Sequence, residues 1–250
     1  VDAILAAEAA GFEYLEGNRS EIARLPEPAF QTRRALVGEA GIDAEVFGCM
    51  LPRELNVTGL GVNAAELHEY LGFAFDRACV LGAKVIVFAS PCARQVPEGF
   101  PVDVAWRQIS NFLRIVEKHA SQRGLTVAVE PLCRSECNIL NTVAEATLLT
   151  SILQLPHIRV LADSYHMAMG HEPLSALSQA GPLLCHVHTA NALGRAFPKA
   201  GDGEDYTALF LALKRADYTG RVSVEGAFED YEGDAKEAFA ALDAARRAVV

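Results

Sequence analysis

Four polar side chains in the sequence have the chemistry to bind a divalent metal ion together. Glu130, Asp163, His188 and Glu225 each close a short apolar run. Three carboxylates and one imidazole make an oxygen-rich ligand set, which suits Mn²⁺, Mg²⁺ or Co²⁺ better than a sulfur-preferring ion, although Zn²⁺ also accepts such ligands. A buried cluster of three carboxylates repels itself and takes up protons unless a cation is present. The residue types therefore predict one divalent metal, with Mn²⁺ as the first choice, or else strongly raised carboxyl pKa values.

The alternation of side chains along each run predicts that these groups point the same way. In the segment 126–130, Thr126, Ala128 and Glu130 share one face of an extended strand, while Val127 and Val129 share the other. The last of the four runs alternates in the same manner. A single polar residue at the end of an inner strand is often a structural group. Four in series favour a site built from four consecutive strand ends.

The elements that carry these residues predict a (β/α)₈ TIM barrel forming a single domain over residues 1–250. Short β-branched runs alternate with longer amphipathic segments along the whole chain, which indicates βα units around a parallel sheet. Seven strands are predicted, at Phe12–Glu16, Ile42–Cys49, Lys84–Ser90, Thr126–Glu130, Arg159–Asp163, Cys185–Thr189 and Arg221–Glu225. A closed barrel has eight strands. Because the residues before Phe12 already look helical, the first strand is expected to be missing from this chain.

Two long connections rich in proline and glycine follow directly on predicted strands, at residues 90–101 and 190–205. In a βα barrel the loops after the strands form the face that carries the active site. Both connections are therefore expected beside the four strand-end residues. Arg94 and Lys199, which lie within them, are expected to be solvated surface charges.

These motifs resemble those of the xylose isomerase-like TIM barrels, and within them the ketose 3-epimerases of the D-tagatose and D-psicose type and related sugar phosphate isomerases and epimerases. The resemblance covers most of the chain after Ser90, and the order of glutamate, aspartate, histidine and glutamate at strand ends is its specific part. It is carried by VEPLCRSE (129–136), LADSYHMAMG (161–170), CHVHTAN (185–191), GRAFPKAGDGED (194–205) and VSVEG (222–226), with SPCARQVPEGF (90–100) as weaker support.

The resemblance implies a role for each matching residue. The four strand-end residues bind the metal, and Glu130 and Glu225 also act as the acid/base pair. Residues that match Glu136, His166 and Arg195 contact oxygen atoms of the substrate. Arg195 lies seven residues after His188, whereas related epimerases place the arginine six residues on, so the match requires a one-residue insertion. The resemblance also implies a homo-oligomer, either a dimer or a tetramer.

The expected reaction is proton transfer next to a carbonyl group of a sugar. A metal that binds the carbonyl oxygen stabilises the enediolate, and a positioned carboxylate can then remove the proton. Glu130 and Glu225 on opposite faces of the substrate would give epimerisation, and one carboxylate returning the proton to the neighbouring carbon would give aldose–ketose isomerisation. A keto-sugar or keto-inositol dehydratase or lyase on the same metal site is the alternative. A binding module without catalysis is disfavoured by the complete ligand set.

Composition excludes several other classes of function. A formal net charge of -10 argues against a nucleic-acid partner, which requires cationic side chains. An apurinic endonuclease of the same fold would also need further metal-binding histidines. No apolar stretch is long enough to cross a bilayer, and no signal peptide is recognised, so a cytoplasmic enzyme with a small sugar substrate is expected.

Two further expectations concern residues outside the ligand set. The chain has six cysteines and no C-x-x-C pair, which favours reduced, structural thiols over disulfides or a zinc ribbon. His186 shares the inner face of its strand with His188 but sits deeper. It is expected to be a hydrogen-bonded core residue or a support for the ligands, and it is left out of the metal set.

Overall fold

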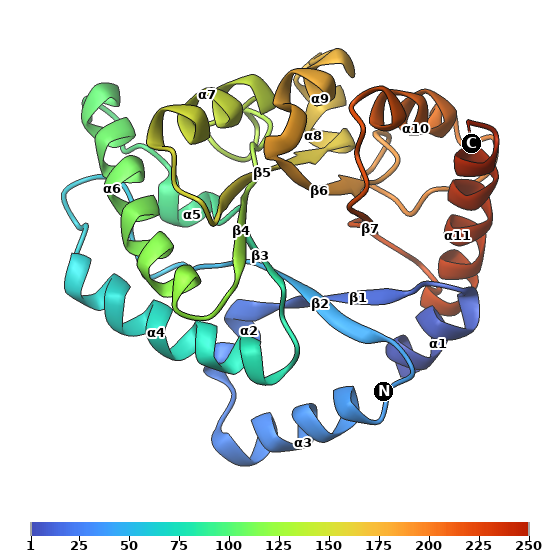
Figure 1. Ribbon diagram of the computed structural model, residues 1–250, viewed down its shortest axis with the longest axis horizontal. Helices are drawn as coiled ribbons and strands as arrows, with labels where there is room; N and C mark the ends of the chain where they lie inside the picture. The colour runs from blue at the N-terminus through green and yellow to red at the C-terminus, as the bar shows by residue number, and fades with distance from the viewer. Residues whose placement is uncertain (1, 250) are drawn as a thin grey trace.

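Seven parallel strands follow one another in chain order around a single sheet in the computed structural model, which describes residues 2–249. The strands are β1 (Tyr14–Asn18), β2 (Asp43–Gly48), β3 (Val85–Phe88), β4 (Thr126–Val129), β5 (Ile158–Asp163), β6 (Leu184–Thr189) and β7 (Arg221–Val224). Every neighbouring pair is parallel. The carboxyl ends of all seven strands therefore lie at one rim of the sheet, and the predicted TIM-barrel architecture is confirmed (Figure 1).

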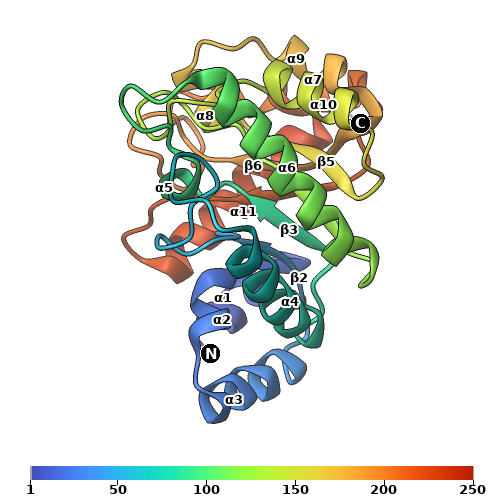
Figure 2. The ribbon, with the colours of Figure 1, turned by 90° about the vertical axis from the view of Figure 1, so that its left-hand side faces the viewer.

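Helices surround the strands on the outside (Figures 1 and 2). They are α1 (Asp2–Ala10), α2 (Arg19–Arg24), α3 (Glu27–Gly38), α4 (Ala64–Val80), α5 (Pro91–Arg94), α6 (Val102–Ser121), α7 (Val143–Leu153), α8 (Ser164–Met169), α9 (Ser175–Ala180), the 3₁₀ helix η1 (Gly181–Leu183), α10 (Tyr206–Arg215) and α11 (Tyr231–Arg247). Thr142 caps α7, since its hydroxyl accepts the Glu145 N–H at 3.1 Å. No helix within residues 2–249 has the length and apolarity needed to span a membrane.

The described residues form seven strands, as predicted, which is one fewer than in a closed (β/α)₈ barrel. Among the described residues, β1 pairs with β2 and β7 pairs with β6, and no pairing joins β1 to β7. Side chains bridge these two edges instead. The Tyr14 hydroxyl lies 2.7 Å from the Ser223 hydroxyl, and the Arg221 guanidinium donates to Glu13 at 2.8 Å. The barrel is therefore nearly closed.

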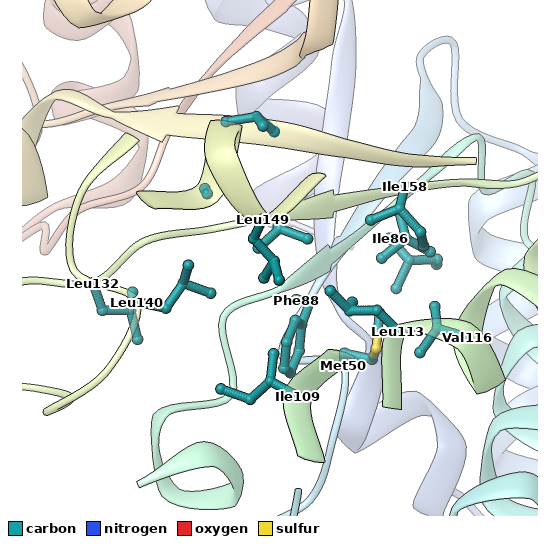
Figure 3. Packing of buried hydrophobic residues seen from close by; sticks show 14 of the residues in the cluster. Met50, Ile86, Phe88, Ile109, Leu113, Val116, Leu132, Leu140, Leu149 and Ile158 are labelled. Carbon is teal, nitrogen blue, oxygen red and sulfur yellow. The ribbon is translucent and has the colours of Figure 1, made fainter. Parts of the chain in front are cut away.

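The core divides into a large outer layer and a small inner one. The outer layer lies between the sheet and its helices, where Phe88 of β3 packs near Ile109 and Leu113 of α6 (Figure 3). The inner layer consists of small and branched side chains that fill the lower part of the barrel: Val46, Val87, Ala128 and Leu161. Apolar side chains thus fill the base of the barrel, and polar side chains are left for the rim.

Candidate metal centre

The four strand-end residues converge at the carboxyl rim of the barrel. Glu130, Asp163, His188 and Glu225 each place a ligand atom within 4.8 Å of those of the other three. Asp163 and His188 are direct partners in the register of β5 and β6. Glu130 and Glu225 lie one residue beyond the ends of β4 and β7, and their N–H groups continue the sheet hydrogen bonding at 3.1 Å. Side chains alternate along each strand, and the parallel register aligns the strand ends, so the four side chains meet at the rim.

The His188 imidazole lies between the two glutamates. Its Nδ1 is 3.2 Å from Oε1 of Glu130 and 3.1 Å from Oε2 of Glu225. Asp163 caps α8, because its Oδ1 accepts the Tyr165 N–H at 2.8 Å, and this bond fixes the orientation of the carboxylate. Glu130, Asp163 and His188 are almost fully buried, whereas the Glu225 side chain is 44% exposed. Glu225 is therefore the member of the cluster that is most open to the rim.

The electrostatics of the cluster fit a bound cation. Burial, together with the neighbouring Glu130, raises the pKa of Asp163 to about 7. Burial and Glu225 likewise raise the pKa of Glu130. Burial disfavours a charged His188, yet Glu16 and Glu130 hold its pKa well above the ordinary value. Without a metal the cluster thus retains protons to offset its negative charge, and a divalent ion bound to three carboxylates and one imidazole supplies the missing positive charge.

The three residues expected to contact substrate lie together beside this cluster. The Arg195 guanidinium donates to Glu136 at 3.2 Å and to Glu225 at 2.6 Å, and its Nη2 lies 3.4 Å from Nε2 of His166. Arg195 has a positive φ of 51° and follows Gly194 at 81°. This left-handed turn folds the loop back and brings the arginine to the site.

His166 is held as a neutral hydrogen-bonding group. Its Nδ1 accepts the Cys133 N–H at 3.2 Å, so the ring carries its proton on Nε2. Burial, together with the neighbouring Arg195, lowers its pKa to about 3. The Nε2–H faces the rim beside Asp163, at 3.6 Å from Oδ2. His166 is therefore a donor available to a substrate oxygen at neutral pH.

The expectation for Arg94 is wrong. The side chain is fully buried and donates to the carbonyl oxygen of Phe88 at 3.1 Å and to that of Glu130 at 2.7 Å. The short helix α5 brings Arg94 to the ends of β3 and β4, where the Phe88 carbonyl also accepts the Glu130 N–H at 3.1 Å and Arg94 supplies the donor for the Glu130 carbonyl. Lys199 is a surface charge as expected, half exposed and paired with Asp234 at 2.7 Å. All six cysteines are unpaired.

Sequence reasoning assigned no role to Glu16, although it predicted that a strand ends there. Its Oε2 lies 3.0 Å from Nε2 of His188 and 3.3 Å from Nε2 of His186. His186 lies beneath the ligands as expected, with Nε2 also 2.9 Å from the Ser223 hydroxyl. Glu16 could have been found by the same signal as the four ligands, because it is also a polar residue at the end of a predicted strand.

Part of the chain is similar in sequence to known sugar epimerases. It is 33% identical to 3-dehydro-D-guloside 4-epimerase of Escherichia coli (strain K12) over 121 residues, which is 48% of this chain and 45% of the relative. It is also 33% identical to D-psicose 3-epimerase of Agrobacterium fabrum over 107 residues, which is 42% of this chain and 36% of the relative. Each match thus spans less than half of the relative's length.

Solved structures show the same fold over nearly the whole chain. A D-psicose 3-epimerase crystallised with D-fructose superposes with a TM-score of 0.85 at 21% identity and covers 100% of this chain and 94% of its own. An E. coli 3-keto-D-glucoside 4-epimerase superposes with a TM-score of 0.79 at 24% identity and covers 95% and 91%. Residues 4–245 match the family described as xylose isomerase-like TIM barrel. The chain therefore belongs to the xylose isomerase-like TIM barrel family.

Proposed function

We propose that this protein is a divalent-metal-dependent epimerase of a ketose or a related keto-sugar. The observation that carries the proposal is the pair of carboxylates, Glu130 and Glu225, which both lie within 3.2 Å of the His188 Nδ1 atom at the mouth of the barrel. Glu130, Asp163, His188 and Glu225 are the proposed ligands, with Mn²⁺ as the proposed ion. When bound, the cation would polarise the sugar carbonyl and make the proton on the adjacent carbon removable. The epimerases of E. coli and A. fabrum support this class of reaction.

The two glutamates are proposed to move the proton. One carboxylate takes the proton from the carbon beside the carbonyl, and the other returns a proton to the same carbon from the opposite face, so the configuration inverts. The Arg195 guanidinium, which donates to Glu225 at 2.6 Å, orients this carboxylate. Buried Glu130 approaches from the inner side, with its backbone carbonyl held by Arg94. Because Glu225 lies at the exposed rim and Glu130 is buried, the two glutamates are proposed to act on opposite faces of the substrate.

Glu136, His166 and Arg195 are proposed to orient the sugar hydroxyls. Together they offer a carboxylate acceptor, a neutral imidazole donor and a guanidinium donor side by side, with Arg195 in contact with both of the others. Such groups bind adjacent hydroxyls and exclude alternative orientations of the sugar chain. A cytoplasmic location, a single domain and a homodimer or homotetramer stay predictions.

Isotope incorporation tests the proposal and separates it from the dehydratase alternative. In D₂O, epimerisation of a ketohexose places deuterium on the carbon beside the carbonyl with no loss of water, whereas a dehydratase or lyase releases water or a fragment. Glu130→Gln and Glu225→Gln are each expected to lose turnover by at least about a hundredfold. Glu204→Gln is the matched control, because Glu204 lies in the rim loop and accepts the Ala192 N–H. Retained activity in either site variant would refute the assigned pair.

The panel should contain two kinds of substrate, because the relatives differ in where they act. In ketohexoses the reacting carbon is C3, next to a carbonyl at C2. In 3-keto-hexosides it is C4, next to a carbonyl at C3. The same pair of carboxylates serves both, since each reaction inverts a carbon adjacent to a carbonyl. The position of the deuterium therefore identifies the substrate class directly.

A further inference from the structure

Glu16 lies directly behind His188, on the side away from the proposed metal. The Nδ1 atom of His188 faces Glu130 and Glu225, whereas its Nε2 lies 3.0 Å from Oε2 of Glu16. His188 is fully buried, and the Glu16 side chain is 17% exposed. The two nitrogens of one ring thus face two different groups of carboxylates.

We propose that Glu16 is a positioning residue that fixes the tautomer and orientation of His188 for metal binding. This inference rests on the proposed function. A neutral imidazole has one N–H and one lone pair. A carboxylate is only an acceptor, so Glu16 holds the N–H at Nε2 and leaves the lone pair of Nδ1 directed at Glu130 and Glu225. A carboxylate behind a ligating histidine also makes the ring a stronger ligand.

A layer of polar side chains holds Glu16 in this position. His186 lies on the same strand as His188, and its Nε2 is 3.3 Å from the same Oε2 atom of Glu16. The Ser223 hydroxyl is 2.9 Å from Nε2 of His186, and the Tyr14 hydroxyl is 2.7 Å from that of Ser223. The layer joins β1, β6 and β7 beneath the four proposed ligands. Because two imidazole rings contact the same Oε2 atom of Glu16, its carboxylate has one preferred orientation.

The measurement is Mn²⁺ affinity of the full chain by isothermal titration calorimetry at one pH. Glu16→Gln keeps an acceptor but removes the charge, and Glu16→Ala removes both. Mn²⁺ is expected to bind about 10- to 100-fold more weakly to these variants, with the alanine variant weakest. Glu45→Gln is the matched control. Glu45 is also a buried carboxylate on an early strand, but it pairs with Lys84 and Arg221 and does not contact His188.

A second readout follows the His188 ring itself. In the Zn²⁺-loaded wild-type protein, ¹⁵N NMR is expected to show His188 protonated at Nε2 with slow solvent exchange. The exchange rate is expected to rise in Glu16→Gln and further in Glu16→Ala, while Glu45→Gln matches the wild type. Glu16→Gln is nearly isosteric, so it keeps the test valid should the alanine variant fail to fold.

The outcomes separate this inference from the proposed function. A wild-type protein that binds no Mn²⁺ would contradict both. A wild-type protein that binds Mn²⁺, with Glu16→Gln and Glu16→Ala within about twofold of it, would overturn the role of Glu16 and leave the proposed function intact. Glu16, His186 and His188 also lie close enough to form a ligand group of their own. Two Mn²⁺ ions per wild-type chain, with one lost in Glu16→Gln, would assign Glu16 as a ligand and overturn the positioning role.

Discussion

Replacing Asp163 by asparagine should stabilise the metal-free protein at high pH while it weakens metal binding. Burial, with Glu130 beside it, raises the pKa of Asp163 from 3.8 to about 7. The protonated carboxyl is thus favoured in the folded protein. Its contribution to stability is present in full below about pH 4 and is lost as the pH rises through about 7, because the unfolded chain ionises first. Each pH unit in this interval costs about 1.4 kcal/mol, so the whole interval costs about 4 kcal/mol.

Asparagine removes this titration with little other change. Its side-chain oxygen can still accept the Tyr165 N–H that Asp163 accepts at 2.8 Å, so the cap of α8 is kept. The contact with Arg195 at 3.4 Å is lost as well, but its attraction for the ionised carboxylate is already contained in the pKa of about 7. The stability of Asp163→Asn relative to wild type should therefore increase by about 3 kcal/mol between pH 5 and pH 8.

Urea unfolding in the presence of EDTA measures this difference at the two pH values. Asp205→Asn serves as the control, since Asp205 also caps a helix, accepting the Ala208 N–H at 2.9 Å, but lies outside the cluster. Adding Mn²⁺ should then reverse the order and favour the wild type. If the stability difference between Asp163→Asn and wild type is the same at pH 5 and pH 8, ionised Asp163 is not strained in the fold. The electrostatic argument for a cation would then be wrong.

Three further predictions follow from the same geometry. Mn²⁺ at about a hundred times its Kd should stabilise the wild type by about 2.7 kcal/mol, which raises Tm by about 5–10 °C in calorimetry, and EDTA should reverse the change. Arg94→Met removes the donor to the buried Glu130 carbonyl, while the Phe88 carbonyl keeps the Glu130 N–H. It should cost about 1–3 kcal/mol in urea unfolding, whereas the same change at exposed Arg114 should cost less than about 0.5 kcal/mol. Gly226→Ala places a Cβ 2.9 Å from the Arg195 carbonyl oxygen. The displaced loop should lower kcat/KM by at least about tenfold. Gly38→Ala is the control, because its Cβ would meet no atom within 4 Å and kcat/KM should stay unchanged.

The strand ends were predictable because two local rules act together. Side chains alternate along a strand, and parallel strands joined by helices end at the same rim. Glu130 and Asp163 could therefore be placed on one side of the barrel from the letters around them. The position of Arg195 was harder, because it depends on a left-handed turn at residues 194 and 195 that spacing alone does not specify.

The partners of Glu16 and Arg94 were not predictable from local pattern. Glu16 and His188 are 172 positions apart in the sequence, and the contact depends on how closely β1 approaches β6 across the barrel. A shift of register between Leu15 and Glu16 adds to this uncertainty. Arg94 lies in a loop whose proline and glycine content favours exposure. Its burial follows from the Glu130 carbonyl just beyond the end of β4, which needs a donor and which only the folded chain brings within reach.

Metal analysis joined to solvent-deuterium exchange tests the central claim most directly. The purified protein is assayed for bound metal, loaded with Mn²⁺ and incubated in D₂O with ketohexoses and 3-keto-hexosides, and the products are followed by NMR. We expect about one ion per chain, with deuterium at the inverted carbon beside the carbonyl and no exchange after EDTA. A protein that binds Mn²⁺ but exchanges no proton of any substrate, or that releases water in place of an epimer, would contradict the proposed epimerase.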